Sequence, residues 1–173
     1  MIERDYILRM IQQLIAVLAK IVFNIKINNP NQARHEINEA MKDMVNGDME
    51  HLRDMSYEEL ISFMNRESPD YALRCLVAAE LFLEQARVDE LSGEVVAVIE
   101  DTYVRALTCY IEGLEADPTM SKRFLPRAAQ AAAKVGTIDE HEQIPALLAR
   151  FEAVKSGGAE AAHHRPATDV GYF

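Results

Sequence analysis

Potential metal ligands occur in two places in the sequence. His35 and Glu39 are four residues apart, so a helix would place them one turn apart, where two side chains can hold one ion. The run from Asp139 to Glu142 combines acids with a histidine, but carboxylates are also expected in the first turn of a helix, where they complement the dipole. We expect both groups on solvated helix faces and predict no metal-binding residue.

Motifs for enzymatic chemistry are missing. The sequence has no H-E-x-x-H, no two Glu-x-x-His motifs of the di-iron type, no G-x-x-x-x-G-K-[ST], no G-x-S-x-G and no G-x-G-x-x-G. Helical catalysts usually recruit a metal or cofactor through such clusters. We therefore predict a protein that is not an enzyme, without catalytic or cofactor-binding residues. The alternative is an enzyme or small-ligand carrier with a pocket between its helices.

One polar stripe is a candidate binding face. Between Tyr6 and Lys26 the sequence contains no acidic residue, although the whole chain carries a net charge of −10. A basic and amide-rich stripe in such a protein suits an acidic peptide, and a merely solvated face is the other interpretation. The candidate partner-binding residues are Arg9, Gln12, Gln13, Lys20 and Asn24.

Composition limits the class of protein and its partners. The 173 residues are 49% hydrophobic and 27% charged, which is typical of one globular domain. The net charge of −10 argues against nucleic acid and anionic membranes as partners, because both attract clustered Lys and Arg. The longest apolar run, residues 14–19, is far shorter than the roughly 20 residues of a membrane span.

Two cysteines indicate the compartment. Cys75 and Cys109 lie inside expected helices without a metal-type spacing, and they are equally distant from a turn at Ser92. We predict buried, reduced thiols at similar heights in a helical hairpin, and hence a cytoplasmic protein. The first residues also lack the features of a secretory signal.

Helical periodicity organises the rest of the chain. The central element is residues 95–118, whose apolar residues fall at three-and-four spacing and leave Arg105 and Glu112 among the residues facing water. Capping and helix-breaking residues divide the remainder into helices. Asn29-Pro30 and Ser68-Pro69 each indicate a helix start, and Gly47 indicates a left-handed C-terminal cap. Capping boxes at Ser56–Glu59 (Ser-x-x-Glu) and Thr137–Glu140 (Thr-x-x-Glu) indicate two further starts. We expect helices over about 5–26, 30–47, 56–65, 69–91, 95–118, 127–136 and 137–155. Pro126 interrupts or restarts the helical turn before the sixth, and Pro145 kinks or divides the last.

These elements predict an all-α fold of six to seven helices, built from stacked antiparallel hairpins. Residues 1–155 form the expected single domain, and residues 156–173 a tail whose Val170, Tyr172 and Phe173 can dock on the body. The first helix is apolar over more of its circumference than one neighbour can cover. We expect the second helix and the central hairpin to enclose most of the excess and a homodimer to bury the rest, with Val17 as the candidate position facing the second copy.

Parts of the central region resemble tetratricopeptide repeats. Ala106, Tyr110 and Pro118 match the small residue, the aromatic and the terminal proline of a second repeat helix. The residues Cys75, Ala78, Ala79 and Phe82 follow the first-helix pattern, and Ala33, Ile37 and Ala40 repeat the second-helix pattern. The resemblance implies elongated, degenerate repeats stacked in a tetratricopeptide-like array.

The opening DYILRMIQQLIAVLAKI, together with the next helix, resembles an uncharacterised family of small all-α bacterial proteins. This second resemblance covers most of residues 1–155 and implies no chemistry. From the architecture we expect a non-catalytic helical-repeat protein that serves as a protein–protein interaction or assembly module.

Overall fold

The structure, a computed structural model, describes residues 2–163 and the side chains of residues 3–157. Those residues contain eight α-helices, one 3-10 turn and no β-strand, which confirms the all-α prediction. The count exceeds the predicted six to seven because the short α3 was not predicted. The elements are α1 (Ile2–Lys26), α2 (Pro30–Val45), α3 (Met49–Asp54), α4 (Tyr57–Met64), α5 (Tyr71–Ser92), α6 (Val96–Ala116), η1 (Pro118–Met120), α7 (Ser121–Val135) and α8 (Ile144–His163).

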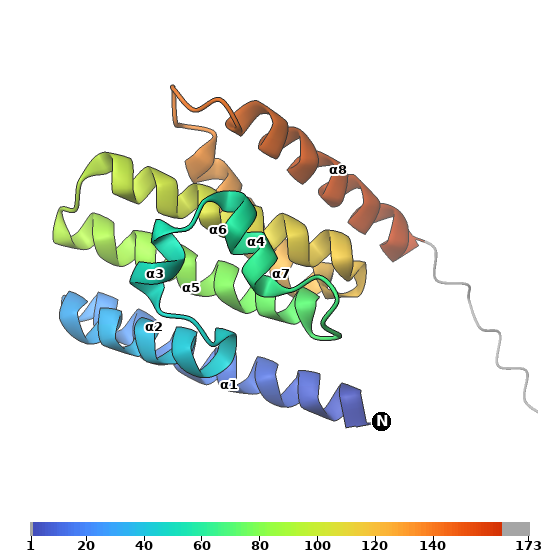
Figure 1. Cartoon of the computed structure of the whole chain (residues 1–173), viewed down its shortest axis with the longest axis horizontal. Coiled ribbons are helices and arrows are strands. Elements are labelled where there is room, and N and C mark those ends of the chain that lie inside the picture. The colour runs from blue at the N-terminus through green and yellow to red at the C-terminus, as the bar shows by residue number, and fades with distance from the viewer. Residues whose placement is uncertain (1, 164–173) are drawn as a thin grey trace, which may run out of the picture.

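The helices pack as a layered stack around the α5–α6 hairpin (Figure 1). The hairpin of α1 and α2 packs on one side of it, mainly through α2 against α5. Helices α7 and α8 pack on the α6 side, and the short α3 and α4 cross in front of the hairpin (Figure 1). Helix α5 is consequently covered nearly all round, whereas α1 lies at the edge of the molecule.

Local sequence signals explain most helix starts. Asn29 caps α2 by accepting a hydrogen bond from the Gln32 backbone, and Ser56 and Glu59 form the predicted capping box of α4. The predicted left-handed cap at Gly47 is wrong, because Asn46 takes that conformation with φ 62°. Asparagine tolerates positive φ better than most residues, so the chain turns one residue earlier.

Three predicted boundaries near prolines are also wrong. Helix α5 begins at Tyr71 after the cap position Asp70, so Pro69 lies outside it. Pro126 lies inside α7 without ending it. Pro145 occupies the second position of α8, where its missing N–H costs little, so it starts the helix instead of kinking it.

The last part of the chain differs from the prediction at both ends of the final helix. The last helix does not end near Lys155 but continues to His163. The Thr137–Glu140 box starts no helix, because residues 137–143 form turns and bends. Val170, Tyr172 and Phe173, whose docking the sequence left open, lie outside the described residues.

Close contact between α5 and α6 depends on small side chains. A Cβ atom added to Gly113 would lie 2.6 Å from Leu76 Cγ and 3.0 Å from the backbone oxygen of Ala72. The two cysteines are buried and unpaired in the same hairpin, as predicted. Glycine at position 113 therefore sets how closely the central helices approach.

Candidate interaction surface

Four of the five predicted partner-binding residues lie on the solvent side of α1. Arg9, Gln12, Gln13 and Lys20 are exposed. Asn24 is only 8% exposed, and its side-chain amide donates a hydrogen bond of 3.0 Å to the Lys20 backbone oxygen. Asn24 therefore does not belong to the predicted binding face, because its side chain is buried against the body of the protein.

A second stripe on α1 consists of large apolar side chains that face solvent. Leu8, Ile15 and Phe23 are 49%, 50% and 60% exposed. At about 100° per residue, these positions and the exposed Ala16 and Ala19 fall within an arc of about 100°. Together with Gln12, an exposed polar residue in the same arc, they form one strip, which we call the outer stripe of α1.

The opposite side of α1 holds the helix on the body. Ile11, Leu14 and Ile21 are buried, and Val17 packs partly buried against the core. The sequence-based expectation that Val17 faces a second copy is therefore wrong. The helix has two apolar sides, and periodicity alone did not show which of them points outward.

Helix α1 is long and apolar enough to cross a membrane by length and composition. Only 17% of its most apolar window is buried in the structure. The uninterrupted run of residues 14–19 is short, but windowed hydropathy tolerates the polar residues that interrupt it. The helix nevertheless packs against α2 and α5 in this structure.

An open cleft of about 640 Å³ lies between α4 and α8, with α6 as its floor. Ile61 and Leu147 supply apolar walls, and Thr108 lies on the floor. Two arginines, Arg66 and Arg150, stand at one end. This cleft, which the sequence did not reveal, is large enough for a small molecule or an inserted side chain.

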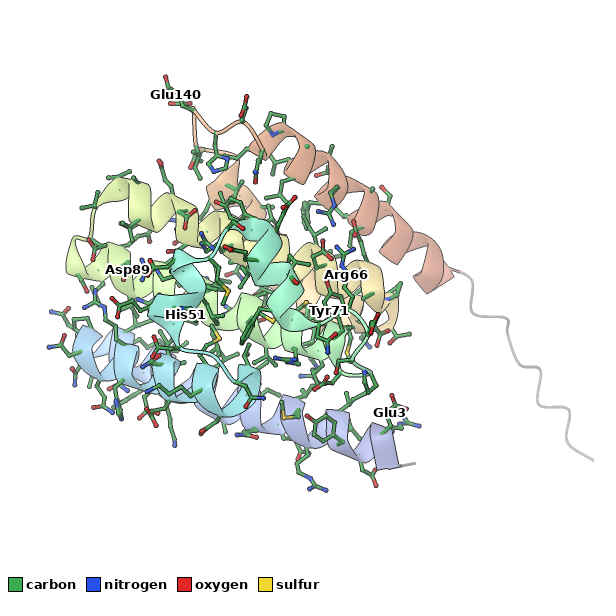
Figure 2. The ribbon with its side chains drawn as sticks, viewed as in Figure 1. Glu3, His51, Arg66, Tyr71, Asp89 and Glu140 are labelled. Atoms are coloured by element: carbon green, nitrogen blue, oxygen red, sulfur yellow. The ribbon has the colours of Figure 1, made fainter. Side chains whose placement is uncertain are left out.

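Glu112 is the charged group beneath the cleft, and it is only 8% exposed. Its carboxylate accepts hydrogen bonds from Tyr71 Oη at 2.8 Å, Arg66 Nη2 at 3.2 Å and Arg150 Nη2 at 3.1 Å. Arg66 and Tyr71 lie at the same end of α5 (Figure 2). These bonds join the α4–α5 loop, the start of α5 and α8 to α6.

Arg105 is the second charged residue of α6 that the sequence analysis wrongly placed in water. It is 6% exposed, and it donates hydrogen bonds to Asp101 Oδ2 at 2.7 Å and to the Leu52 backbone oxygen at 3.2 Å. Tyr57 Oη donates to Asp101 Oδ1 at 2.6 Å, and its ring packs edge-on against His141. Helices α3 and α4 thus cover the side of α6 that periodicity assigned to solvent.

Buried acids on α5 are paired with arginines from neighbouring helices. Arg127 of α7 donates from Nε to Glu80 at 2.9 Å and from Nη2 to Glu84, and both acids are at most 2% exposed. Burial raises the pKa of the Glu80 carboxyl, and the charge of Arg127 opposes that shift. Asp89 lies near the C-terminal end of α5 (Figure 2). Its Oδ2 atom is 3.0 Å from Arg53 Nη2 of α3.

The cysteine thiols and tyrosine hydroxyls, which are potential nucleophiles, have pKa values shifted away from those of reactive groups. Burial raises the pKa of the Cys75 thiol to about 12 and raises the pKa of Cys109 well above its ordinary value. Burial and the hydrogen bond to Asp101 raise the pKa of Tyr57, and burial and the bond to Glu112 raise that of Tyr71. A catalytic thiol or phenol needs the opposite shift toward neutral pH.

His35 and Glu39, which were not predicted to bind a metal, lie on the surface of α2. His35 is exposed, and the Glu39 carboxylate lies 3.6 Å from Lys42 Nζ. Among the described residues, no group of three or more histidine, cysteine or acidic side chains gathers at one point.

Sequence comparison places the chain in a family. Residues 1–144 match DUF6483, a family of unknown function. No curated protein and no solved structure gives a match. The match covers most of the chain and includes every helix from α1 to α7. The protein therefore belongs to the DUF6483 family.

Proposed function

We propose that this protein is a non-catalytic, tetratricopeptide-like helical module of the cytoplasm that binds another protein through the outer stripe of α1. The single observation that carries the proposal is the alignment of Leu8, Ile15 and Phe23, all about half exposed, along one face. Isolated apolar side chains on a surface are ordinary, whereas continuous apolar strips are typical of interaction sites.

Covering the apolar strip contributes to binding but does not suffice alone, because association itself costs about 4–15 kcal/mol. Complete burial of a Leu, Ile or Phe side chain contributes about 1.5–3 kcal/mol, so covering the exposed halves of three contributes about 3 kcal/mol before other contacts. Arg9, Gln13 and Lys20 border the strip on one side. These polar side chains can stay hydrated beside a partner that covers the strip, so binding does not require their burial.

Other features support the remaining parts of the proposal. Ala106 and Tyr110 are buried one turn apart on α6, and Pro118 comes directly after the C-cap residue Asp117, as in a tetratricopeptide unit. Buried free thiols suit a reducing compartment. The net charge of −10 argues against nucleic acid or an anionic membrane as the partner.

Affinity capture from the native cells tests the proposal. The baits are the full chain, the variant Ile15→Glu, and the control Gln13→Glu, which places the same charge on the polar edge of α1. We expect one or more proteins to be retained by the wild type and the control and lost with Ile15→Glu. Identical sets from all three baits would contradict the proposal.

The cleft between α4 and α8 supports a second candidate function, the binding of a small molecule. Its volume of about 640 Å³ suits such a ligand. Native mass spectrometry of the protein from its own cells should then show a bound mass that Ala146→Trp removes by filling the cleft. The variant Ala149→Trp, on the same helix but outside the lining, is the control.

A further inference from the structure

The spacing of the outer stripe suits a long contact with a second helix. Leu8, Gln12, Ile15, Ala19 and Phe23 follow one another at intervals of four, three, four and four, a mean of about 3.75 residues, which is near the 3.6-residue period of a straight helix. A stripe of this spacing keeps two helices in contact over several turns when their axes are nearly aligned and about 8–10 Å apart. The stripe therefore predicts a helical partner lying nearly along α1.

We propose that this partner is a second copy of the chain, bound through its own α1 in antiparallel orientation, with the two-fold axis between residues 15 and 16. The proposal rests on the function proposed above and specifies its partner. Helix α1 lies at the edge of the stack, with no other helix of the chain beyond it in the described residues (Figure 1). A second copy can therefore reach the outer stripe without displacing any element.

The outer stripe is self-complementary in size about this axis. Ile15 faces Ala16 of the partner subunit, so a large side chain on one helix meets a small one on the other. Gln12 faces the partner's Ala19 in the same way, and Leu8 packs against the partner's Phe23 at each end. Alternation of large and small side chains lets two helices approach closely without leaving a gap.

Charges at the ends of α1 select the antiparallel orientation. Asp5 faces Lys26 of the partner subunit at both ends of the pair, which gives two attractive contacts. A parallel pair would place Asp5 against the partner's Asp5 and Lys26 against the partner's Lys26, both repulsive. In a parallel pair, Ala16 would also face the partner's Ala16, and Ala19 would face the partner's Ala19. Small side chains would then meet small ones and leave the centre poorly filled.

The same residues make a lipid surface a poorer occupant. Small alanines at the centre of a strip favour close helix packing but bury little area in a bilayer. The first turn carries Glu3 and Asp5, and the chain as a whole is acidic, so an anionic membrane repels it. A second copy of α1 satisfies both the apolar stripe and the charges of Asp5 and Lys26 at the helix ends.

Disulfide mapping of the full chain tests the orientation. In the proposed pair, Gln12 of one copy faces Ala19 of the other, whereas two copies of the same position lie about 10.5 Å apart along the axis, given 1.5 Å per residue. Disulfides need Cβ atoms within about 4.5 Å. Under mild oxidation, an equimolar mixture of Gln12→Cys and Ala19→Cys should give at least about tenfold more linked dimer than either variant alone. The native thiols are buried and should not contribute.

Controls separate the possible outcomes. Gln13→Cys, exposed on the polar edge, should not link to Ala19→Cys. Linking of each variant with itself would overturn the proposal, because it shows a parallel pair. A single species of 19.5 kDa in sedimentation equilibrium would overturn it as well. A third result would also overturn the proposal: wild-type monomers float with phosphatidylcholine–phosphatidylglycerol vesicles, and the Ile15→Glu variant does not. If capture from cells still depends on Ile15 in those cases, the proposed function stands and only the second copy is refuted.

Discussion

Replacement of Arg127 by methionine should destabilise the protein in a pH-dependent manner. The side chain of Arg127 is 25% exposed and pairs with Glu80 and Glu84, whose side chains are at most 3% exposed. Removing one partner of a buried ion pair typically costs 3–5 kcal/mol, because the other charge stays buried without compensation. Since Arg127 keeps some contact with water, we expect a loss of about 3 kcal/mol at about pH 7.5.

The pH dependence follows from the raised pKa of Glu80. A carboxyl whose pKa is higher in the folded than in the unfolded state destabilises the fold when it ionises, so stability falls as pH rises from the unfolded toward the folded value. Without Arg127 the folded pKa should rise further. The loss in Arg127→Met should therefore be smaller at about pH 5 than at about pH 7.5.

Urea unfolding followed by circular dichroism at fixed protein concentration measures both effects. The control is Arg150→Met, since Arg150 is 40% exposed and its partner Glu112 keeps bonds to Arg66 and Tyr71. We expect a loss below about 1 kcal/mol there. Equal losses in the two variants, or the same loss in Arg127→Met at both pH values, would refute this explanation of the α5 acids.

Gly113→Ala should destabilise the fold by about 1–3 kcal/mol, because the new methyl group collides with Leu76 and the α5 backbone. Gly157→Ala, which meets nothing within 4 Å in α8, is the control and should be neutral or slightly stabilising in the same urea titration. Cys75 and Cys109 should resist alkylation by iodoacetamide in the native protein and react fully after denaturation, as intact-mass spectrometry can show. Modification of either thiol under native conditions would mean that the α5–α6 core opens.

Helix existence was readable from the sequence where a cap coincided with a periodic run. Ser56 and Glu59 identified α4, and Asn29 with Pro30 identified α2. The same type of pattern failed at Thr137, where the periodic apolar residues begin only at Ile144. The six-residue α3 is too short for a periodic signal, although Asp48 caps it as a helix start.

The environment of each helix was less predictable than its position. Periodicity showed which side of α6 is more apolar, and so it placed Arg105 and Glu112 in water. Both are buried because α3, α4 and α8 cover the polar side and supply partners. On α1 the excess of apolar residues was visible in the sequence, but the choice of Ile15 over Val17 as the outward residue depends on how α2 and α5 pack against it.

Site-specific photo-cross-linking in the native cells tests most directly whether the outer stripe of α1 is covered by protein. A photoreactive phenylalanine analogue replaces Ile15 in one variant and the exposed Lys122 of α7 in the control. We predict protein adducts from position 15 and none from position 122. Adducts from neither position, or only lipid adducts from position 15, would contradict a protein-binding role for this face.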